Sequence, residues 1–208
     1  MRLGVDEAGR GCLIGPMVVA GVVLREEAME RLRNAGVKDS KKLTRAQRER
    51  LFDLITTESD ALAVAKAQPD EIDLHNLNSV TYLKVIQVID SLSWLKPDMV
   101  TVDKVGKEIE VIRFIEELGL KSNVIHKADE TFIEASAASV VAKVIRDRLI
   151  DSMKQTYGDF GSGYPSDRKT VKWIKELVEK GGDPPNIIRR TWKFLLKHAP
   201  SFYVEKVS

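Results

Sequence analysis

Short apolar runs, separated by glycine and proline, predict five β-strands along this chain. Residues 2–6 and Met17–Leu24 lie on either side of a glycine-rich segment, which predicts two antiparallel neighbours joined by a loop. Three further runs have the length and composition of strands, namely Ala61–Ala67, residues 99–102 and residues 123–126.

Apolar positions spaced three and four residues apart predict helices between and after these strands. The predicted helices span residues 43–57, 72–94, 109–118, 136–153, 170–180 and 187–198. Thr44 and Gln47 predict a capping box at the start of the first helix, and Pro97 ends the second.

A meander of strands followed by alternating strands and helices predicts an α/β fold, with a mixed five-stranded sheet flanked by helices. We expect residues 1–150 to form this core. We expect residues 151–208 to form a small C-terminal helical extension that packs on the core.

Composition excludes several classes of protein. A hydrophobic content of 43% excludes wholesale disorder, and the single cysteine, Cys12, excludes a disulfide framework and a Cys/His zinc site. The longest apolar run, Met17–Leu24, is far shorter than the ~20 residues that a membrane span needs. Asp6 and Glu7 do not fit a signal peptide. We expect a cytoplasmic protein that does not associate with membranes.

The charged residues are distributed unevenly. The whole chain has a formal charge of +2, but residues 1–120 carry −3 and residues 121–208 carry +5. Such asymmetry favours a polyanionic partner such as nucleic acid, and an ordinary surface of mixed charges is an equally open reading.

Acidic residues recur at the ends of predicted strands. Asp6 and Glu7 close the first strand, Asp103 closes the fourth, and Asp129 follows the fifth. Sites in α/β sheets gather at the carboxyl ends of strands, so these four carboxylates could converge. Oxygen ligands suit Mg²⁺, and two such ions could support phosphodiester hydrolysis. For any single acid, a turn or a helix cap is the more common role.

The glycine-rich segment at residues 9–15 has the spacing GxGxxxG. A dinucleotide-binding fingerprint has GxGxxG and is followed by a helix, whereas an extended run follows here. Gly9, Arg10 and Gly11 would let backbone N–H groups approach a sugar-phosphate, and a plain tight turn is the alternative. The chain also lacks the GxxxxGK[ST] sequence of a P-loop.

Basic and hydroxyl side chains supply candidate phosphate contacts. Lys41 belongs to a charged run that precedes a helix, a position that suits phosphate. Ser136, Ser139 and Lys143 share one polar stripe of a predicted helix, which would bind a phosphate backbone or simply face solvent.

Two C-terminal segments place aromatic residues beside basic or flexible ones. Tyr164 lies between a glycine and a proline and could stack on a sugar or base. Arg189, Arg190 and Lys193 interleave with Trp192, which suits a nucleic-acid backbone, although a tryptophan is more often part of the core.

Ordered sequence blocks along the whole chain resemble the type 2 ribonuclease H (ribonuclease HII) family. The blocks are DEAGRG at residues 6–11 with GP at 15–16, DSKKL at 39–43, ID at 72–73 with NLN at 76–78, Asp103, HKAD at 126–129 with SAAS at 136–139 and AKVIRD at 142–147, and GSGYPSD at 161–167 with RTW at 190–192. The last two resemble archaeal members.

This resemblance implies a ribonuclease H-like fold and a metal-dependent endoribonuclease. The substrate would be the RNA strand of RNA/DNA hybrids and the 5′ side of ribonucleotides embedded in duplex DNA, with 3′-hydroxyl and 5′-phosphate products. It also implies roles for individual residues. Asp6, Glu7, Asp103 and Asp129 would hold two Mg²⁺ or Mn²⁺ ions, residues 9–11 would read the 2′-hydroxyl, and Tyr164 would stack at the RNA–DNA junction.

The chain departs from the family pattern at three places. Glu130 and Glu134 add acids near the fourth ligand and could compete with it, and Lys104 follows the third acid where a small residue is usual. The C-terminal residues 202–204 lack the sequence pattern that docks on a sliding clamp, so a clamp partner is open, and we expect a monomer.

Three other functions fit parts of the sequence. A DNA nuclease of related fold would cut without needing a 2′-hydroxyl, and a hybrid-binding module would use the same surface without catalysis. A small-molecule phosphohydrolase would use the same acids.

Overall fold

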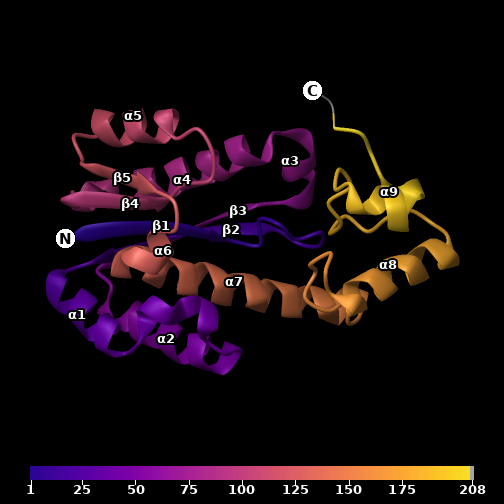
Figure 1. Ribbon diagram of the computed structural model, residues 1–208, viewed down its shortest axis with the longest axis horizontal. Coiled ribbons are helices and arrows are strands. Elements are labelled where there is room, and N and C mark those ends of the chain that lie inside the picture. Colours follow the sequence, from indigo (N-terminus) through magenta and orange to yellow (C-terminus); the bar gives the residue numbers. More distant parts are fainter. Residues whose placement is uncertain (207–208) are drawn as a thin grey trace.

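A mixed five-stranded sheet, with strand order β3-β2-β1-β4-β5, forms the centre of the molecule (Figure 1). The computed structural model describes residues 1–206, without the side chains of residues 39–41. The strands are β1 Arg2–Ala8, β2 Met17–Leu24, β3 Ala61–Ala67, β4 Met99–Asp103 and β5 Ser122–Ile125. β2 pairs antiparallel with β1 and β3, whereas β4 pairs parallel with β1 and β5. The predicted mixed sheet and the antiparallel β1–β2 pair are confirmed.

Helices cover both faces of this sheet, and further helices extend from one end (Figure 1). The helices are α1 Glu26–Asn34, α2 Arg45–Glu58, α3 Pro69–Leu74, α4 Leu77–Leu92, α5 Ile109–Glu117, α6 Ala128–Thr131, α7 Ile133–Tyr157, α8 Arg168–Lys180 and α9 Phe194–His198, with short 3₁₀ turns at Val37–Lys42, Ser93–Leu95 and Pro200–Phe202. The long helix α7 lies with α1 and α2 on one face, and α4 and α5 lie on the other (Figure 1). None of the described helices is both long and apolar enough to cross a membrane.

Side chains on the two faces of β2 belong to two separate apolar cores. Val18, Ala20 and Val22 pack with α1, α2 and α7, whereas Val19 and Val23 pack with α4 and α5. Successive side chains of a strand point to opposite faces, so one strand that is apolar at every position serves both layers.

Helix α7 approaches the central strand closely enough to require a glycine there. A Cβ on Gly4 of β1 would lie 2.1 Å from the backbone carbonyl carbon and oxygen of Glu134. This close approach brings the start of α7 onto the central strand β1, and α6, directly before it, lies against β4.

The structure corrects the prediction of one helix over residues 72–94. The helix is interrupted between α3 and α4. The side chain of Asn76 accepts hydrogen bonds from the backbone N–H groups of Asn78 and Ser79 and so caps the start of a new helix. Pro97 lies beyond the end of α4, which stops at Leu92. The capping box of Thr44 and Gln47 at the start of α2 is confirmed.

One further helix was not predicted, and one predicted helix is mostly absent. Helix α1 was not predicted, although it buries Ala28, Met29 and Leu32. The predicted helix over residues 187–198 is helical only in α9, because the backbone N–H groups of Arg190 and Thr191 are bound by the Asp73 carboxylate instead of by helical carbonyls.

The C-terminal extension shares an apolar core with the first part of the chain. Leu13, Ile14 and Ile150 pack with Phe160, Ile174, Ile187, Leu195 and Phe202. An isolated antiparallel bridge joins Ile14 to Ile188. The expected boundary after residue 150 lies inside α7.

Candidate active site

Three carboxylates meet at the carboxyl ends of two neighbouring parallel strands. Asp6 and Glu7 lie near the end of β1, and Asp103 is the last residue of β4. Because β1 and β4 are parallel and Val5 pairs with Val102, their acids reach the same edge of the sheet. One ligand oxygen from each of the three acids lies within 4.8 Å of the others, a spacing that can hold a metal ion.

Asp129, the fourth predicted acid, lies beside this cluster. It is 4% exposed, and its charge contributes to raising the pKa of Asp6. The preceding residue, Ala128, donates its backbone N–H to Asp103 Oδ1 at 2.8 Å. This hydrogen bond holds the segment that carries Asp129 against Asp103. The four predicted acids therefore lie close to one another at this edge of the sheet.

Asp6 is buried, Glu7 and Asp103 are half-buried, and the charges of these carboxylates repel one another. Burial and then the neighbouring Glu7 charge raise the pKa of Asp6 well above its usual value, and a hydrogen bond from Ser139 acts in the opposite direction. Burial and then the Asp103 charge raise the pKa of Glu7. A divalent cation would offset this repulsion, and an all-oxygen donor set suits a hard ion such as Mg²⁺ or Mn²⁺.

The two acids that could compete as ligands have other partners. Glu134 is buried and accepts a hydrogen bond from Thr101 Oγ1 at 2.8 Å, with Arg2 Nη1 at 3.8 Å. Glu130 is exposed and lies 3.6 Å from Lys127 Nζ. Neither belongs to the three-acid group.

The basic residue next to Asp103 also contacts a different acid. Lys104 Nζ donates to Glu108 Oε1 at 2.7 Å, which lowers the pKa of Glu108. Lys104 and Glu108 thus form an ion pair four residues apart.

The polar stripe of α7 points into the protein, and this corrects the expectation for its serines. Ser136 and Ser139 are fully buried. The Ser136 hydroxyl donates to the backbone carbonyl of Asp129, and Lys143 Nζ donates to Ser139 Oγ at 2.7 Å. A buried hydroxyl cannot contact a phosphate backbone in this conformation, so Ser136 and Ser139 support the acids. Lys143 is half-buried beside them.

The glycine-rich segment forms a turn directly after β1. Gly9 has φ +81°, and Cys12 N–H closes the turn onto the Gly9 carbonyl at 3.3 Å. Arg10 Nη2 donates to Asn78 Oδ1 at the start of α4, and Gly11 faces open space. The side chain of Lys41, a further predicted phosphate contact, lies outside the described residues.

Tyr164 lies on a second loop that is bonded to the first. The Gly163 carbonyl accepts the N–H groups of Leu13 at 2.8 Å and Ile14 at 3.1 Å. The Tyr164 ring is 40% exposed and lies over the Arg146 guanidinium at 5.3 Å, and burial raises its pKa to about 12. An aromatic face thus stands beside the glycine-rich segment.

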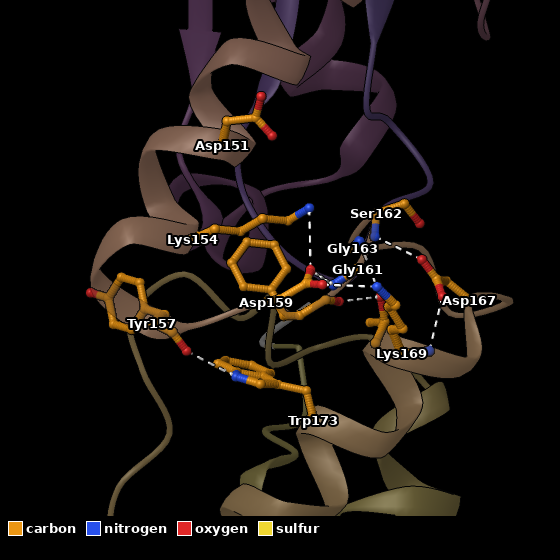
Figure 2. Close-up of polar contacts among 12 residues, drawn as sticks. Asp151, Lys154, Tyr157, Asp159, Gly161, Ser162, Gly163, Asp167, Lys169 and Trp173 are labelled. Atoms are coloured by element: carbon orange, nitrogen blue, oxygen red, sulfur yellow. Dashed lines mark hydrogen bonds and ion pairs between the residues drawn. The ribbon is translucent and has the colours of Figure 1, made fainter. Parts of the chain in front are cut away.

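Acidic side chains hold this second loop against α8 (Figure 2). Asp167 caps α8 and accepts the N–H groups of Ser162 at 2.7 Å and Lys169 at 2.9 Å. Lys169 Nζ also binds Asp159 Oδ2 at 2.9 Å. The position of Tyr164 is therefore set by a network that the sequence pattern alone did not predict.

The basic and aromatic C-terminal segment is mostly unavailable to a ligand. Arg189 is fully buried, Arg190 donates to the Phe202 carbonyl at 2.9 Å, and Trp192 packs against two apolar cores. Only Lys193 of the predicted group is exposed. The expectation that Arg189 contacts a nucleic-acid backbone is wrong, because no part of its side chain reaches solvent.

Known proteins resemble this chain over nearly its full length. The ribonuclease HII family model matches residues 3–195. The ribonuclease HII of Saccharolobus solfataricus is 58% identical over 206 residues, 99% of this chain and 97% of that protein. The crystal structure of ribonuclease H2 from Pyrococcus horikoshii matches with TM-score 0.84 and 42% identity, covering 97% and 98% of the two chains. The ribonuclease HII of Archaeoglobus fulgidus, solved in complex with PCNA, matches with TM-score 0.82 and 40% identity, covering 93% and 94%.

Proposed function

The chain belongs to the ribonuclease HII family, and we propose that it cleaves the RNA strand of RNA/DNA hybrids and the 5′ side of ribonucleotides embedded in duplex DNA. It is a ribonuclease H endonuclease, and the products would carry 3′-hydroxyl and 5′-phosphate ends. The observation that carries the proposal is the cluster of Asp6, Glu7 and Asp103, which lies directly before a glycine-rich turn.

We propose that Asp6, Glu7, Asp103 and Asp129 hold two Mg²⁺ or Mn²⁺ ions. Their crowding supports this, because burial and mutual repulsion raise the pKa of both Asp6 and Glu7 in the absence of a cation. Bound ions would activate water and stabilise the charge that develops at the cleaved phosphodiester. Ser139 and the Ala128 N–H would keep two of the carboxylates oriented through their hydrogen bonds.

Selection of ribonucleotides is assigned to the two bonded loops. The 2′-hydroxyl is the group that distinguishes RNA from DNA at a given nucleotide, and backbone groups at Gly9, Arg10 and Gly11 can approach it closely. The exposed part of the Tyr164 ring would stack on the sugar or base at the junction. Lys41 and Lys143 would contact phosphates, and Ser136 and Ser139 would act through the acids they support.

Cleavage of a duplex DNA with one embedded ribonucleotide tests this function. We expect cleavage on the 5′ side of the ribonucleotide with Mg²⁺ or Mn²⁺ and none in EDTA. An all-DNA duplex of the same sequence is the control, because a DNA nuclease of related fold would cut both. Binding without turnover in the presence of either metal would instead identify a hybrid-binding module, and no cleavage by folded protein would refute the proposal.

We also propose a monomer that docks on a sliding clamp. Support comes from the Archaeoglobus fulgidus ribonuclease HII, whose solved structure is a complex with PCNA. In this chain Phe202 is buried and Val204 is 41% exposed, so docking through residues 202–204 would have to release Phe202 from its core. Co-elution with a purified clamp in gel filtration is the expected result, and separate elution of the two proteins would contradict the proposal.

A further inference from the structure

A fully buried arginine lies behind the glycine-rich segment. Arg189 Nη2 donates to the Gly9 carbonyl at 2.6 Å, Nη1 to the Arg10 carbonyl at 2.8 Å and Nε to the Gly15 carbonyl at 3.0 Å. Its backbone N–H donates to the Leu13 carbonyl at 2.9 Å. One residue from the C-terminal extension thus binds four carbonyl groups of one short turn.

A cation in this position is costly unless its donors are satisfied. Burial lowers the pKa of Arg189 to about 10, so the side chain stays charged at neutral pH. Hydrogen bonds to a charged donor are stronger than neutral ones, and a buried charge without partners is strongly destabilising. The three carbonyls and the guanidinium therefore depend on one another.

These contacts fix the direction of two peptide groups. In a trans peptide the C=O and the following N–H point in opposite directions. Because the carbonyls of Gly9 and Arg10 point at Arg189, the N–H groups of Arg10 and Gly11 point away from it. Gly11 itself has open space beside it, because a Cβ built on it would meet no atom within 4 Å.

A second arginine joins the same turn to the Tyr164 loop. Arg146 Nη2 lies 3.3 Å from both the Ile14 and Ser162 carbonyls, and its side chain fills the space where a Cβ of Gly9 would lie. The turn is therefore held from behind by Arg189 and from the side by Arg146.

We propose that Arg189 is a positioning residue for ribonucleotide recognition, which orients the backbone N–H groups of Arg10 and Gly11 towards the substrate by binding the carbonyls of Gly9, Arg10 and Gly15. This inference rests on the proposed function. It gives the C-terminal extension a direct part in substrate selection, although Arg189 itself never touches the substrate.

The test compares Arg189→Lys and Arg189→Ala with Ile174→Val, a conservative change in the C-terminal core that removes none of the hydrogen bonds from Arg189. Lysine keeps the charge but cannot bind three carbonyls in a planar fork. We expect both Arg189 variants to lose about 10²-fold in kcat/KM on the single-ribonucleotide duplex, the scale of a misplaced contact group. Ile174→Val should retain wild-type kcat/KM.

Two further readouts separate positioning from loss of fold. Hydrogen–deuterium exchange of a peptide spanning residues 8–16 should be faster in Arg189→Lys than in Ile174→Val, at temperatures where both remain folded. Ethylguanidinium at millimolar concentration should restore part of the activity of Arg189→Ala and none of that of an Asp103→Asn variant. If Arg189→Ala does not fold, Arg189→Lys and the exchange measurement still decide the question.

The outcomes distinguish this inference from the proposed function. Absence of cleavage by the wild-type protein would refute the function itself. Cleavage by wild type with equal activity and exchange in Arg189→Lys and Ile174→Val would refute the positioning role alone.

Discussion

Two glycines of the same turn should respond differently to alanine. A Cβ on Gly9, which has φ +81°, would lie 2.2 Å from Arg146 Nε, whereas a Cβ on Gly11 meets no atom within 4 Å. Arg146 is buried and cannot move aside without breaking its own contacts. We expect Gly9→Ala to lower the free energy of unfolding by about 1–3 kcal/mol or more, and Gly11→Ala to change it by less than about 0.5 kcal/mol. Urea denaturation measures both, and equal losses would contradict the prediction.

Removing one charge from the acid cluster should separate stability from activity. Burial and the Asp103 charge raise the pKa of Glu7 above 4.5. The free energy of unfolding therefore falls as the pH rises from 4.5 through the folded-state pKa of Glu7, because the folded protein disfavours the ionised form. We expect Glu7→Gln to raise the melting temperature in EDTA at neutral pH. The same change should lower metal-dependent activity by at least about 10²-fold, because bound ions supply several kcal/mol of transition-state stabilisation.

Calorimetry with and without Mn²⁺ provides the matching control. Wild-type protein should gain melting temperature when the ion binds, and Glu7→Gln should gain less. A lower melting temperature for Glu7→Gln in EDTA would show that the Glu7 charge does not strain the folded protein.

The candidate acids were predictable because their signal is local. Each follows a short apolar strand, and parallel neighbours place Asp6 and Asp103 at one edge. The family resemblance inferred from the ordered motifs is confirmed. The burial of Ser136 and Arg189 was not predictable, because it depends on which residues distant in sequence cover them. A buried arginine and an exposed one have the same sequence signal.

At the scale of elements, the stability of the loop between α7 and α8 should depend on pH, because one exposed acid, Asp159, titrates there. Bonds from Lys169 and then from the Gly161 N–H lower the pKa of Asp159 from 3.8 to about 2 (Figure 2). Its contribution to stability is therefore complete above about pH 4 and is lost as the pH falls towards 2. We expect Asp159→Asn to be less stable than wild type at neutral pH, and we expect the difference to disappear as the pH falls through 2.

The size of this effect should be modest, because an exposed ion pair is screened by solvent and salt. Chemical denaturation at several pH values measures it. Lys169→Met should abolish most of the difference between wild type and Asp159→Asn, and a difference that does not shrink as the pH falls from 4 through 2 would contradict the assignment.

The boundaries of helices were less predictable than the strands. The apolar spacing continues through residues 72–94, so periodicity alone joins α3 and α4, and the decisive feature is a single capping residue, Asn76. Helix α1 has only nine residues, of which Ala28, Met29 and Leu32 are buried, so its periodic signal is short. Around Arg190, distant contacts with Asp73 override the helical pattern.

At the scale of the whole molecule, the C-terminal extension should unfold together with the sheet. The apolar core around Phe160 includes Leu13 and Ile14 from the first loop, and Arg189 binds the carbonyls of that loop. We expect one cooperative thermal transition whose calorimetric and van't Hoff enthalpies agree. Two resolved transitions would instead identify residues 151–208 as an independent unit.

The distribution of charge predicts how affinity should depend on salt. Residues 121–208 carry +5 and residues 1–120 carry −3. The attraction of residues 121–208 for phosphate is therefore larger than the net charge of +2 suggests. We expect the affinity of the Asp103→Asn variant for a ribonucleotide-containing duplex to fall linearly with salt on logarithmic axes, by about 0.9 per phosphate neutralised.

Two lysines, Lys143 on α7 and Lys96 before β4, provide a matched pair for this measurement. Lys143 lies beside Ser139 at the acid cluster, whereas Lys96 precedes β4, at the end opposite to Asp103. We expect Lys143→Gln to reduce the salt slope by about one, because one phosphate contact is lost, and Lys96→Gln to leave the slope unchanged. Equal slopes for the two variants would contradict a phosphate path along the carboxyl ends of the strands. A slope near zero in the parent variant would favour a small-molecule substrate, because such a ligand displaces few counterions.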